Sequence, residues 1–335
     1  MLTPKSSNTF MFLLFVTSIV LSLVIGGIYA VVMISPHINF DPPMWLLVLV
    51  IQVLSFGVPT VIYCAIHRDK IKEILPMRRL GGLNVLMIVG MSLVIQPLFM
   101  LINLLSQFLF PNYIADVIAD IALDGGLFVT LGIVAVVPSI FEEISFRGAG
   151  FAGFKHVNIR TAALINGLMF GMIHMNMNQF LYAFLLGAVF CYFMYYTKSL
   201  WAPILAHFIF NGTQSLIAFL ALSFDPYALE AAEMAMSADS EMLFASLFLG
   251  IIAVAFTAGF IAIFIAFKKH NLKRNEAEGI VTDTAAAFIA EGGTRPKAFT
   301  WAFWVVVGLF GAMMLGTYLL PALIYGVDLV AAVGL

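Results

Sequence analysis

Residues 161–197 read TAALINGLMFGMIHMNMNQFLYAFLLGAVFCYFMYYT and contain no Asp, Glu, Lys or Arg. A helix that crosses the hydrocarbon core of a bilayer needs about 20 apolar residues. This run is therefore too long for one span, and the polar residues Asn176, Asn178 and Gln179 lie near its middle. The pattern predicts two membrane helices, at 160–175 and 178–196, joined by a tight turn.

The rest of the chain is as apolar as this stretch. Hydrophobic residues make up 62% of the 335 residues, charged residues make up 10%, and the mean hydropathy is +1.05. A soluble protein needs more charge than this on its surface. We therefore predict an all-α, polytopic bundle of nine transmembrane helices, forming one membrane domain over residues 1–335 within the lipid bilayer. The other seven predicted helices are 9–34, 43–66, 83–110, 127–152, 200–221, 242–267 and 300–323.

The first and third predicted helices each have a distinctive feature. The run at 9–34 is too long and too uniformly apolar for a cleavable signal peptide, so we interpret it as a retained membrane helix. Gln96-Pro97 lies within the third helix. Proline removes a backbone donor and crowds the preceding turn, so a kink is expected there.

The connections between the predicted helices alternate in charge. Basic connections contain Arg68, Lys70, Lys72, Arg78, Arg79, then Lys155, Arg160, then Lys198, then Lys268, Lys269, Lys273, Arg274, Arg295 and Lys297. Acidic connections contain Asp116, Asp120, Asp124, then Asp225, Glu230, Glu233, Asp239 and Glu241. Since positive loops remain in the cytoplasm, the N-terminus is expected to be cytoplasmic and the C-terminus outside. The segment 268–299 is then a cytoplasmic linker with a stretch suited to the membrane surface.

Composition also argues against several other classes. A formal net charge of -2 gives no indication of nucleic-acid binding. Cys64 and Cys191 lie in separate apolar runs, which does not fit a disulfide scaffold or a structural zinc knuckle.

A few ionisable residues lie inside the predicted membrane helices. Glu142, Glu143 and Arg147 are in the fourth helix, His174 ends the fifth, and His207 is in the seventh, followed by Asn211. Each such group costs roughly several kcal/mol in a bilayer, and such groups commonly mark function. Because they occur on three helices within about 70 residues, we expect them to converge on one site.

The two glutamates have different surroundings by spacing alone. Glu143 and Arg147 are four residues apart, so they share a helix face and can pair. Glu142 is turned by about 100° from Glu143 and can point into the bundle. A carboxylate in an apolar site suits a general base near neutral pH. The alternative is a purely structural ion pair at the end of a helix.

The histidines leave two interpretations open as well. His207 and Asn211 share a face and offer donors for a developing oxyanion, or they bond to neighbouring helices and hold the bundle together. His174 follows Phe170 by four residues and is either catalytic or a helix–helix contact.

These residues resemble the motifs of the CAAX prenyl endopeptidase and bacteriocin-processing (CPBP, or Abi) family of intramembrane peptidases. That family carries Glu-Glu-x-x-x-Arg, Phe-x-x-x-His and His-x-x-x-Asn/Asp on successive helices. The corresponding segments here are 142–147, 170–174 and 207–211, within a catalytic core at 127–215.

The resemblance implies a role for each residue. Glu142 would activate the attacking water with help from His174, while His207 and Asn211 would stabilise the oxyanion. Glu143 and Arg147 would orient the site. A second scheme has Glu142, His174 and His207 binding Zn²⁺, which would activate the water instead. The chain has no His-Glu-x-x-His, so local sequence does not fix a metal geometry.

The expected partner is a hydrophobic or membrane-anchored peptide, which the protein would hydrolyse. The expected location is the cell membrane of a bacterium, namely its inner membrane. Two other functions remain open for this protein. It could be an inactive scaffold or bacteriocin-immunity protein of the same fold, or a proton-coupled transporter that uses a glutamate. One geometric difficulty also remains. Glu142 and His207 are expected nearer the cytoplasmic side, whereas His174 is expected near the outer end of the fifth helix.

The alternating charges give a topology prediction. A reporter fused after Arg79 or within 270–295 should be cytoplasmic, and one within 226–238 should be external. If alkaline phosphatase and green fluorescent protein fusions place both regions on the same side, the nine-helix arrangement is wrong.

Overall fold

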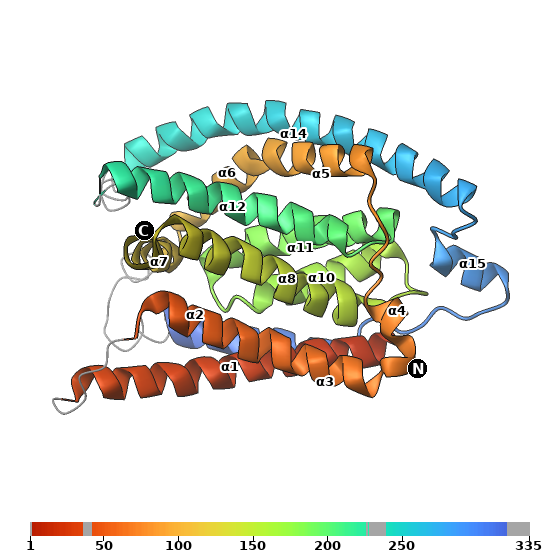
Figure 1. Cartoon of the computed structure of the whole chain (residues 1–335), viewed down its shortest axis with the longest axis horizontal. Coiled ribbons are helices and arrows are strands. Elements are labelled where there is room, and N and C mark those ends of the chain that lie inside the picture. The colour runs from red at the N-terminus through yellow and green to blue at the C-terminus, as the bar shows by residue number, and fades with distance from the viewer. Residues whose placement is uncertain (1, 36–41, 226, 228–238, 320–335) are drawn as a thin grey trace.

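The computed structural model describes residues 2–35, 42–225, 227 and 239–319. Over these residues the protein is a bundle of helices (Figure 1). Eight helical segments are long and apolar enough to cross a membrane, and a ninth apolar helix, Ile159–Met172, is shorter. The predicted all-α, polytopic membrane bundle is therefore confirmed.

Several membrane segments are built from consecutive helices. The element bounds are α1 Pro4–Ile34; α2 Met44–Gln52 and α3 Val58–Ile66; α4 Ile71–Ile74; α5 Gly82–Val94 and α6 Gln96–Gln107; α7 Tyr113–Thr130, α8 Val137–Glu143 and α9 Gly150–Ala152; α10 Ile159–Met172; α11 Met177–Thr197; α12 Trp201–Phe224; α14 Asp239–Ala277; α15 Thr284–Ala290; and α16 Trp301–Met314. The break between α5 and α6 falls at Ile95, where Gln96-Pro97 predicted a kink.

The acidic segment before the fourth predicted helix is itself helical, which corrects the expected connection. Ile114, Ile118 and Ile121 recur on one face of α7, and the aspartates at 116, 120 and 124 lie exposed on the other. This periodicity is that of an amphipathic helix. Its first part ends at Gly126, whose φ of 68° breaks the helical path. Figure 1 accordingly shows α7 nearly end-on, whereas α8 runs across the view.

Other bounds differ from the expected ones in smaller ways. The helix expected to end at 267 continues to Ala277, and the following segment includes the short helix α15. The last predicted helix is described as α16 with a further π-helical turn, Leu315–Leu319, and residues 320–323 lie outside the described part. Glu230, Glu233 and most of the external reporter site at 226–238 also lie outside it.

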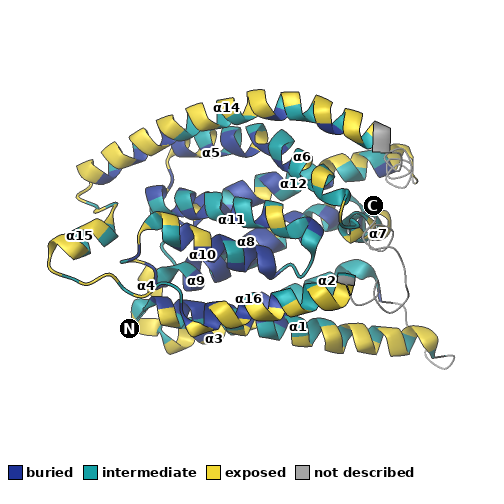
Figure 2. Cartoon of the chain, turned by 180° about the vertical axis from the view of Figure 1, so that it is seen from behind, coloured by how far each residue is buried: buried dark blue, intermediate teal, exposed yellow. Residues whose placement is uncertain are grey.

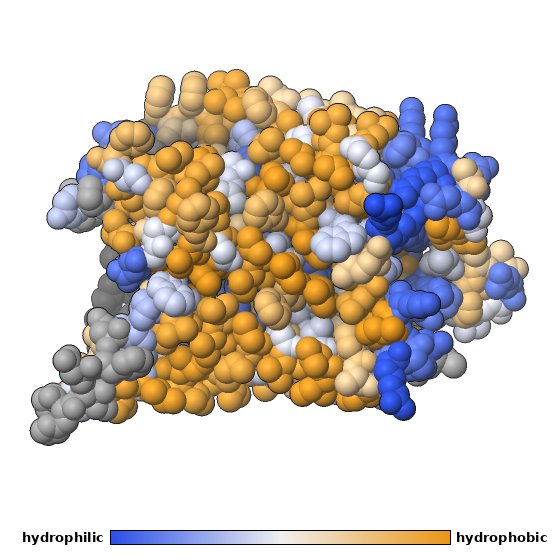
Figure 3. Space-filling view, in the orientation of Figure 1, coloured by the Kyte–Doolittle hydropathy of each residue, from blue (hydrophilic) through white to orange (hydrophobic). Residues whose placement is uncertain are grey.

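Hydropathy divides the surface along the bundle. Hydrophilic side chains gather at the end that carries the N-terminus, α4 and α15, and hydrophobic side chains cover the middle (Figure 3). Large apolar side chains on α14, such as Ile251 and Val254, are about three-quarters exposed. Such exposure is stable only if lipid covers it, which fits a multi-pass membrane protein.

The short helix α10 lies inside the bundle and packs closely on α11. Nine of its 14 residues are buried, and Figure 2 shows it among the darkest helices. A Cβ at Gly167 would lie 2.8 Å from the Phe184 carbonyl oxygen, and one at Gly171 would lie 2.7 Å from that of Phe180. Small residues of this kind let two membrane helices approach closely. The glycines therefore fix how deeply α10 enters the bundle.

We predict that Gly167→Ala destabilises the protein by about 1 to 3 kcal/mol, since the added methyl group must push α11 away. Gly308→Ala on α16 is the matched control, because a Cβ there meets nothing within 4 Å. It should change stability by less than about 0.5 kcal/mol. Thermal melting in detergent measures both, and equal melting temperatures for the two variants would contradict the packing argument.

Candidate active site

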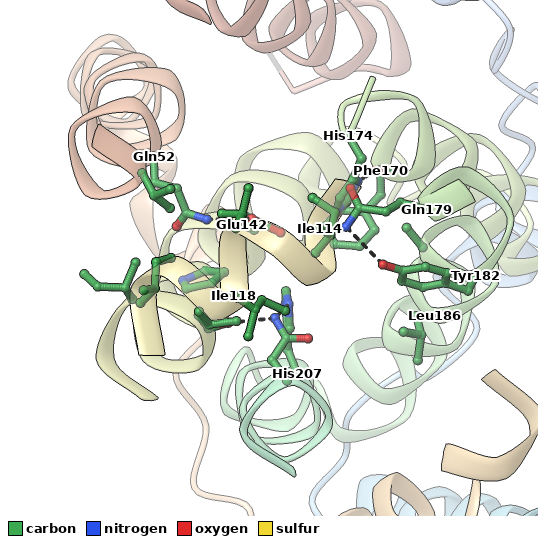
Figure 4. Close-up of a pocket in the computed structure, with 18 of the residues that line it drawn as sticks. Gln52, Ile114, Ile118, Glu142, Phe170, His174, Gln179, Tyr182, Leu186 and His207 are labelled. Atoms are coloured by element: carbon green, nitrogen blue, oxygen red, sulfur yellow. Dashed lines mark hydrogen bonds between the residues drawn. The ribbon is translucent and has the colours of Figure 1, made fainter. Parts of the chain in front are cut away.

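A cavity of about 240 Å³ lies between α2, α7, α8, α11 and α12, beside the end of α10 (Figure 4). Four of the six predicted site residues line it, namely Glu142, His174, His207 and Asn211. Glu143 and Arg147 lie behind this wall with no exposed surface. The structure thus brings the predicted residues to one place, in two layers.

The inner layer is centred on one carboxylate oxygen of Glu143. Its Oε1 accepts a hydrogen bond from Arg147 Nη1 at 2.9 Å and another from His207 Nδ1 at 2.8 Å. The predicted Glu143–Arg147 pair is therefore present. The bond to His207 was not anticipated, because helical spacing says nothing about a partner on a different helix.

The hydrogen bonds also define the tautomer of His207. Asn211 Nδ2 donates to the Val134 carbonyl oxygen at 3.0 Å, so its nitrogen must face that way. The same nitrogen lies 3.2 Å from His207 Nε2 and donates to it. Nε2 is then an acceptor, and the ring proton is on Nδ1, facing Glu143. Both amide protons of Asn211 are engaged in this arrangement.

Aromatic rings surround the guanidinium of Arg147. Its Cζ lies 4.2 Å from the ring centroid of Phe170 and 5.4 Å from that of Phe190, within the range of cation–π attraction. The ring of Phe170 also packs edge-on against His174 and His207, with ring centroids 5.1 Å and 6.0 Å apart respectively. Phe170 therefore separates and positions three polar side chains at once.

Glu142 is held far more loosely than Glu143. Among the described residues, its one side-chain hydrogen bond comes from Gln52 Nε2, at 3.4 Å from Oε1. Figure 4 shows Glu142 and Gln52 side by side at the cavity wall. Gln52 was missed by the sequence analysis, although it is a lone carboxamide in the apolar run 43–66. The two neighbouring carboxylates thus differ in their contacts: Glu143 is bonded to Arg147 and His207, whereas Glu142 faces the cavity with one long hydrogen bond.

The position of His174 removes the expected mismatch in depth. α10 ends at Met172, so His174 lies outside the helix rather than at its end. Fourteen residues span only about 21 Å, less than the roughly 30 Å hydrocarbon core. Asn176 then caps α11 by accepting from the backbone N–H groups of Asn178 and Gln179. His174 Nδ1 donates to the Phe170 carbonyl oxygen at 2.8 Å, which leaves Nε2 as an acceptor.

The backbone beneath the site is a π-helical segment, Ile144–Ala149, directly after the two glutamates. Such segments are rare and often occur at functional sites. Polar side chains hold it in place: Ser145 Oγ and Thr60 Oγ1 lie 2.7 Å apart, and Asn166 Nδ2 donates to the Phe146 carbonyl oxygen at 2.8 Å. These contacts keep Arg147 and the glutamates in register.

The alternative zinc scheme does not fit this arrangement. In the described part of the chain, no three His, Cys, Asp or Glu side chains lie close enough together to hold a metal ion. Both ring nitrogens of His207 already have hydrogen-bond partners. Glu142, His174 and His207 therefore line one cavity without forming a ligand set.

Comparisons with known proteins match the part of the chain that carries this site. Residues 124–213 match the family described as "Type II CAAX prenyl endopeptidase Rce1-like". The protein named "Putative membrane peptidase YdiL" from Bacillus subtilis (strain 168) is 33% identical over 78 residues. That match spans 23% of this chain and 32% of the relative. No solved structure matches the chain significantly.

The two glutamates should respond differently to the same substitution. Glu143→Gln leaves Arg147 buried with a weaker partner, so we expect a loss of about 3 kcal/mol in stability and a partial loss of activity. Glu142→Gln should leave stability nearly unchanged and remove nearly all activity. Thermal melting and peptide cleavage in detergent distinguish them. The reverse order would mean that Glu143 is the base.

Proposed function

We propose that this protein is an intramembrane endopeptidase, because residues 124–213, which carry the site, match the family described as Type II CAAX prenyl endopeptidase Rce1-like. Its substrate is a hydrophobic or membrane-anchored peptide, and Glu142 is the general base. The observation that carries the proposal is the contrast between the adjacent glutamates. Glu143 is occupied by Arg147 and His207, whereas Glu142 faces the cavity with one long hydrogen bond.

Hydrolysis begins with a water molecule in the cavity. His174 Nε2 and the Glu142 carboxylate are the acceptors available to orient it. Glu142 takes one proton as the water oxygen attacks the carbonyl carbon of the scissile peptide. The protonated Glu142 then donates that proton to the leaving nitrogen as the C–N bond breaks. The products are one new carboxyl group and one new amine.

The tetrahedral intermediate needs a donor for its oxyanion. Asn211 supplies it when one amide proton turns from His207 Nε2 to the substrate oxygen, which is a stronger acceptor once it is charged. The Nδ1–H of His207 remains bonded to Glu143, so the ring keeps its orientation. Glu143 and Arg147 act through His207 and are positioning residues. No step of this scheme uses a metal.

The apolar surface of the bundle favours a substrate that is itself in or attached to the membrane. We place the protein in the cell membrane of a bacterium, in keeping with the matching relative from Bacillus subtilis. An inactive scaffold or bacteriocin-immunity protein of the same fold, or a proton-coupled transporter, would bind or move its ligand without breaking a peptide bond.

The decisive experiment compares peptides released by cells that carry wild-type protein with those released by cells that carry Glu142→Ala. Peptides present only with the wild type are expected, and one of them then serves as a substrate in detergent. Glu142→Gln should lower its cleavage by about 10² to 10⁴-fold, the usual contribution of proton transfer. His174→Ala and His207→Ala should each abolish most of the cleavage as well, because they remove the groups that orient the water and Asn211. Expression and membrane insertion should be unchanged. Wild-type cleavage by all three variants would contradict the roles assigned to these residues, whereas identical peptides from the two kinds of cells would indicate a scaffold.

A further inference from the structure

A second cavity, of about 280 Å³, adjoins the first. The two share residues from α7, α11, α12 and the π-helical turn after α7, namely Ile114, Ile118, Val134, Gln179, Tyr182 and Asn211. From Asn211 the second cavity follows α12 to Ala218 and reaches Asn112, in the connection between α6 and α7. It therefore extends from the reacting groups away from the end that carries α4 and α15 (Figure 1).

Carboxamides dominate the polar lining of this second cavity, which we call the amide groove. They are Asn103, Asn112, Gln179, Asn211 and Gln214. None of the described residues that line it carries a charge at neutral pH. The structure records no hydrogen bond within the described chain for the side-chain amides of Asn103 and Asn112. These two amides are thus free to bond to a ligand.

A carboxamide carries both a donor and an acceptor. Several of them along one groove can bond to the alternating N–H and C=O groups of an extended peptide, which otherwise lose their water at a cost of about 1 to 3 kcal/mol each. The remaining lining is apolar and includes Phe99, Met100 and Phe210. An ionised side chain would find no counter-charge there. The groove therefore favours an uncharged segment in extended conformation.

The first part of α7 covers both cavities. Ile114 and Ile118 face them, whereas Asp116, Asp120 and Asp124 are exposed on the opposite face. The bend at Gly126 lets this part of α7 lie across the end of the bundle instead of continuing along it. The route to Glu142 thus runs beneath the apolar face of an amphipathic helix, at the end opposite the basic connections.

We propose that the amide groove binds an extended, uncharged peptide segment next to the scissile bond, and that substrate reaches the site from the end of the bundle opposite α4 and α15. This inference rests on the proposed peptidase function. It specifies that the groove recognises the backbone of the substrate, and it specifies the end of the bundle from which the substrate enters. Asn103, Asn112 and Gln214 are the residues that would bind it.

Accessibility of single cysteines tests both statements. Ala218 lines the groove, and its neighbour Ile217 is 55% exposed on the lipid-facing side of the same helix. We would introduce Ala218→Cys, Ile217→Cys or Lys155→Cys into the Glu142→Gln protein, with Cys64 and Cys191 left in place as background. Membrane vesicles of both orientations are then labelled with a charged, impermeant methanethiosulfonate. The probe ligand is an acetylated and amidated octapeptide of alternating alanine and leucine.

The expected pattern has three parts. Ala218→Cys is labelled from the side opposite to Lys155→Cys, and Ile217→Cys is labelled slowly from either side. The octapeptide slows labelling of Ala218→Cys alone. N-methylation of its backbone, or Asn103→Leu with Asn112→Leu in the protein, relieves this protection about fivefold for each hydrogen bond of about 1 kcal/mol lost.

Labelling of Ala218→Cys and Lys155→Cys from the same side would overturn the route. Protection that survives N-methylation would overturn backbone recognition and indicate a merely apolar cavity that also suits a lipid chain. Absence of protection would overturn the groove as a peptide site. Since the Glu142→Gln protein cuts nothing, these results are independent of cleavage. Protection combined with no peptide released by wild-type cells would refute the peptidase and leave the groove.

Discussion

The geometry of the site depends on the hydrogen bonds that the buried carboxylate of Glu143 accepts. A single oxygen accepts from Arg147 and from His207, so it ties the segment after α8 to α12 in a medium with no water to replace either partner. Breaking such a pair from one side strands the other charge. Because adjacent helical residues point about 100° apart, fixing Glu143 also fixes where Glu142 points. Glu142 is thus positioned mainly by its neighbour, since its own side chain has one long hydrogen bond among the described residues.

Helix α10 supplies the second constraint. Its glycines bring it against α11, and this approach places Phe170 over the guanidinium of Arg147. The same ring packs against His174 and His207, so Phe170 both fills the core and contacts the polar groups of the site. A larger residue at Gly167 would displace this ring together with the helix. The geometry of the site thus depends on residues that do not line the cavity.

The all-α bundle and the two four-residue pairs could be predicted from the sequence because both depend on local spacing. Apolar length determines a span, and residues four apart share a face whatever the tertiary structure. The His207–Glu143 bond and the amide groove could not be predicted, since each joins helices distant in sequence. The segment with Asp116 was expected to be a loop because of its aspartates, although its isoleucines repeat with the spacing of an amphipathic helix. A lone glutamine in an apolar run was the one overlooked signal.

The shortness of α10 has a further consequence for how the protein sits among lipids. A helix that faces lipid cannot stop within the hydrocarbon core, whereas α10 has only 14 residues and is mostly buried in protein, so it can end there. Hydrophobic mismatch with thick or thin bilayers acts on the perimeter, where the outer helices can tilt to absorb it. The depth of His174 is instead set by the count of residues in α10. Variation in membrane thickness would therefore rearrange the rim of the bundle around an unchanged centre.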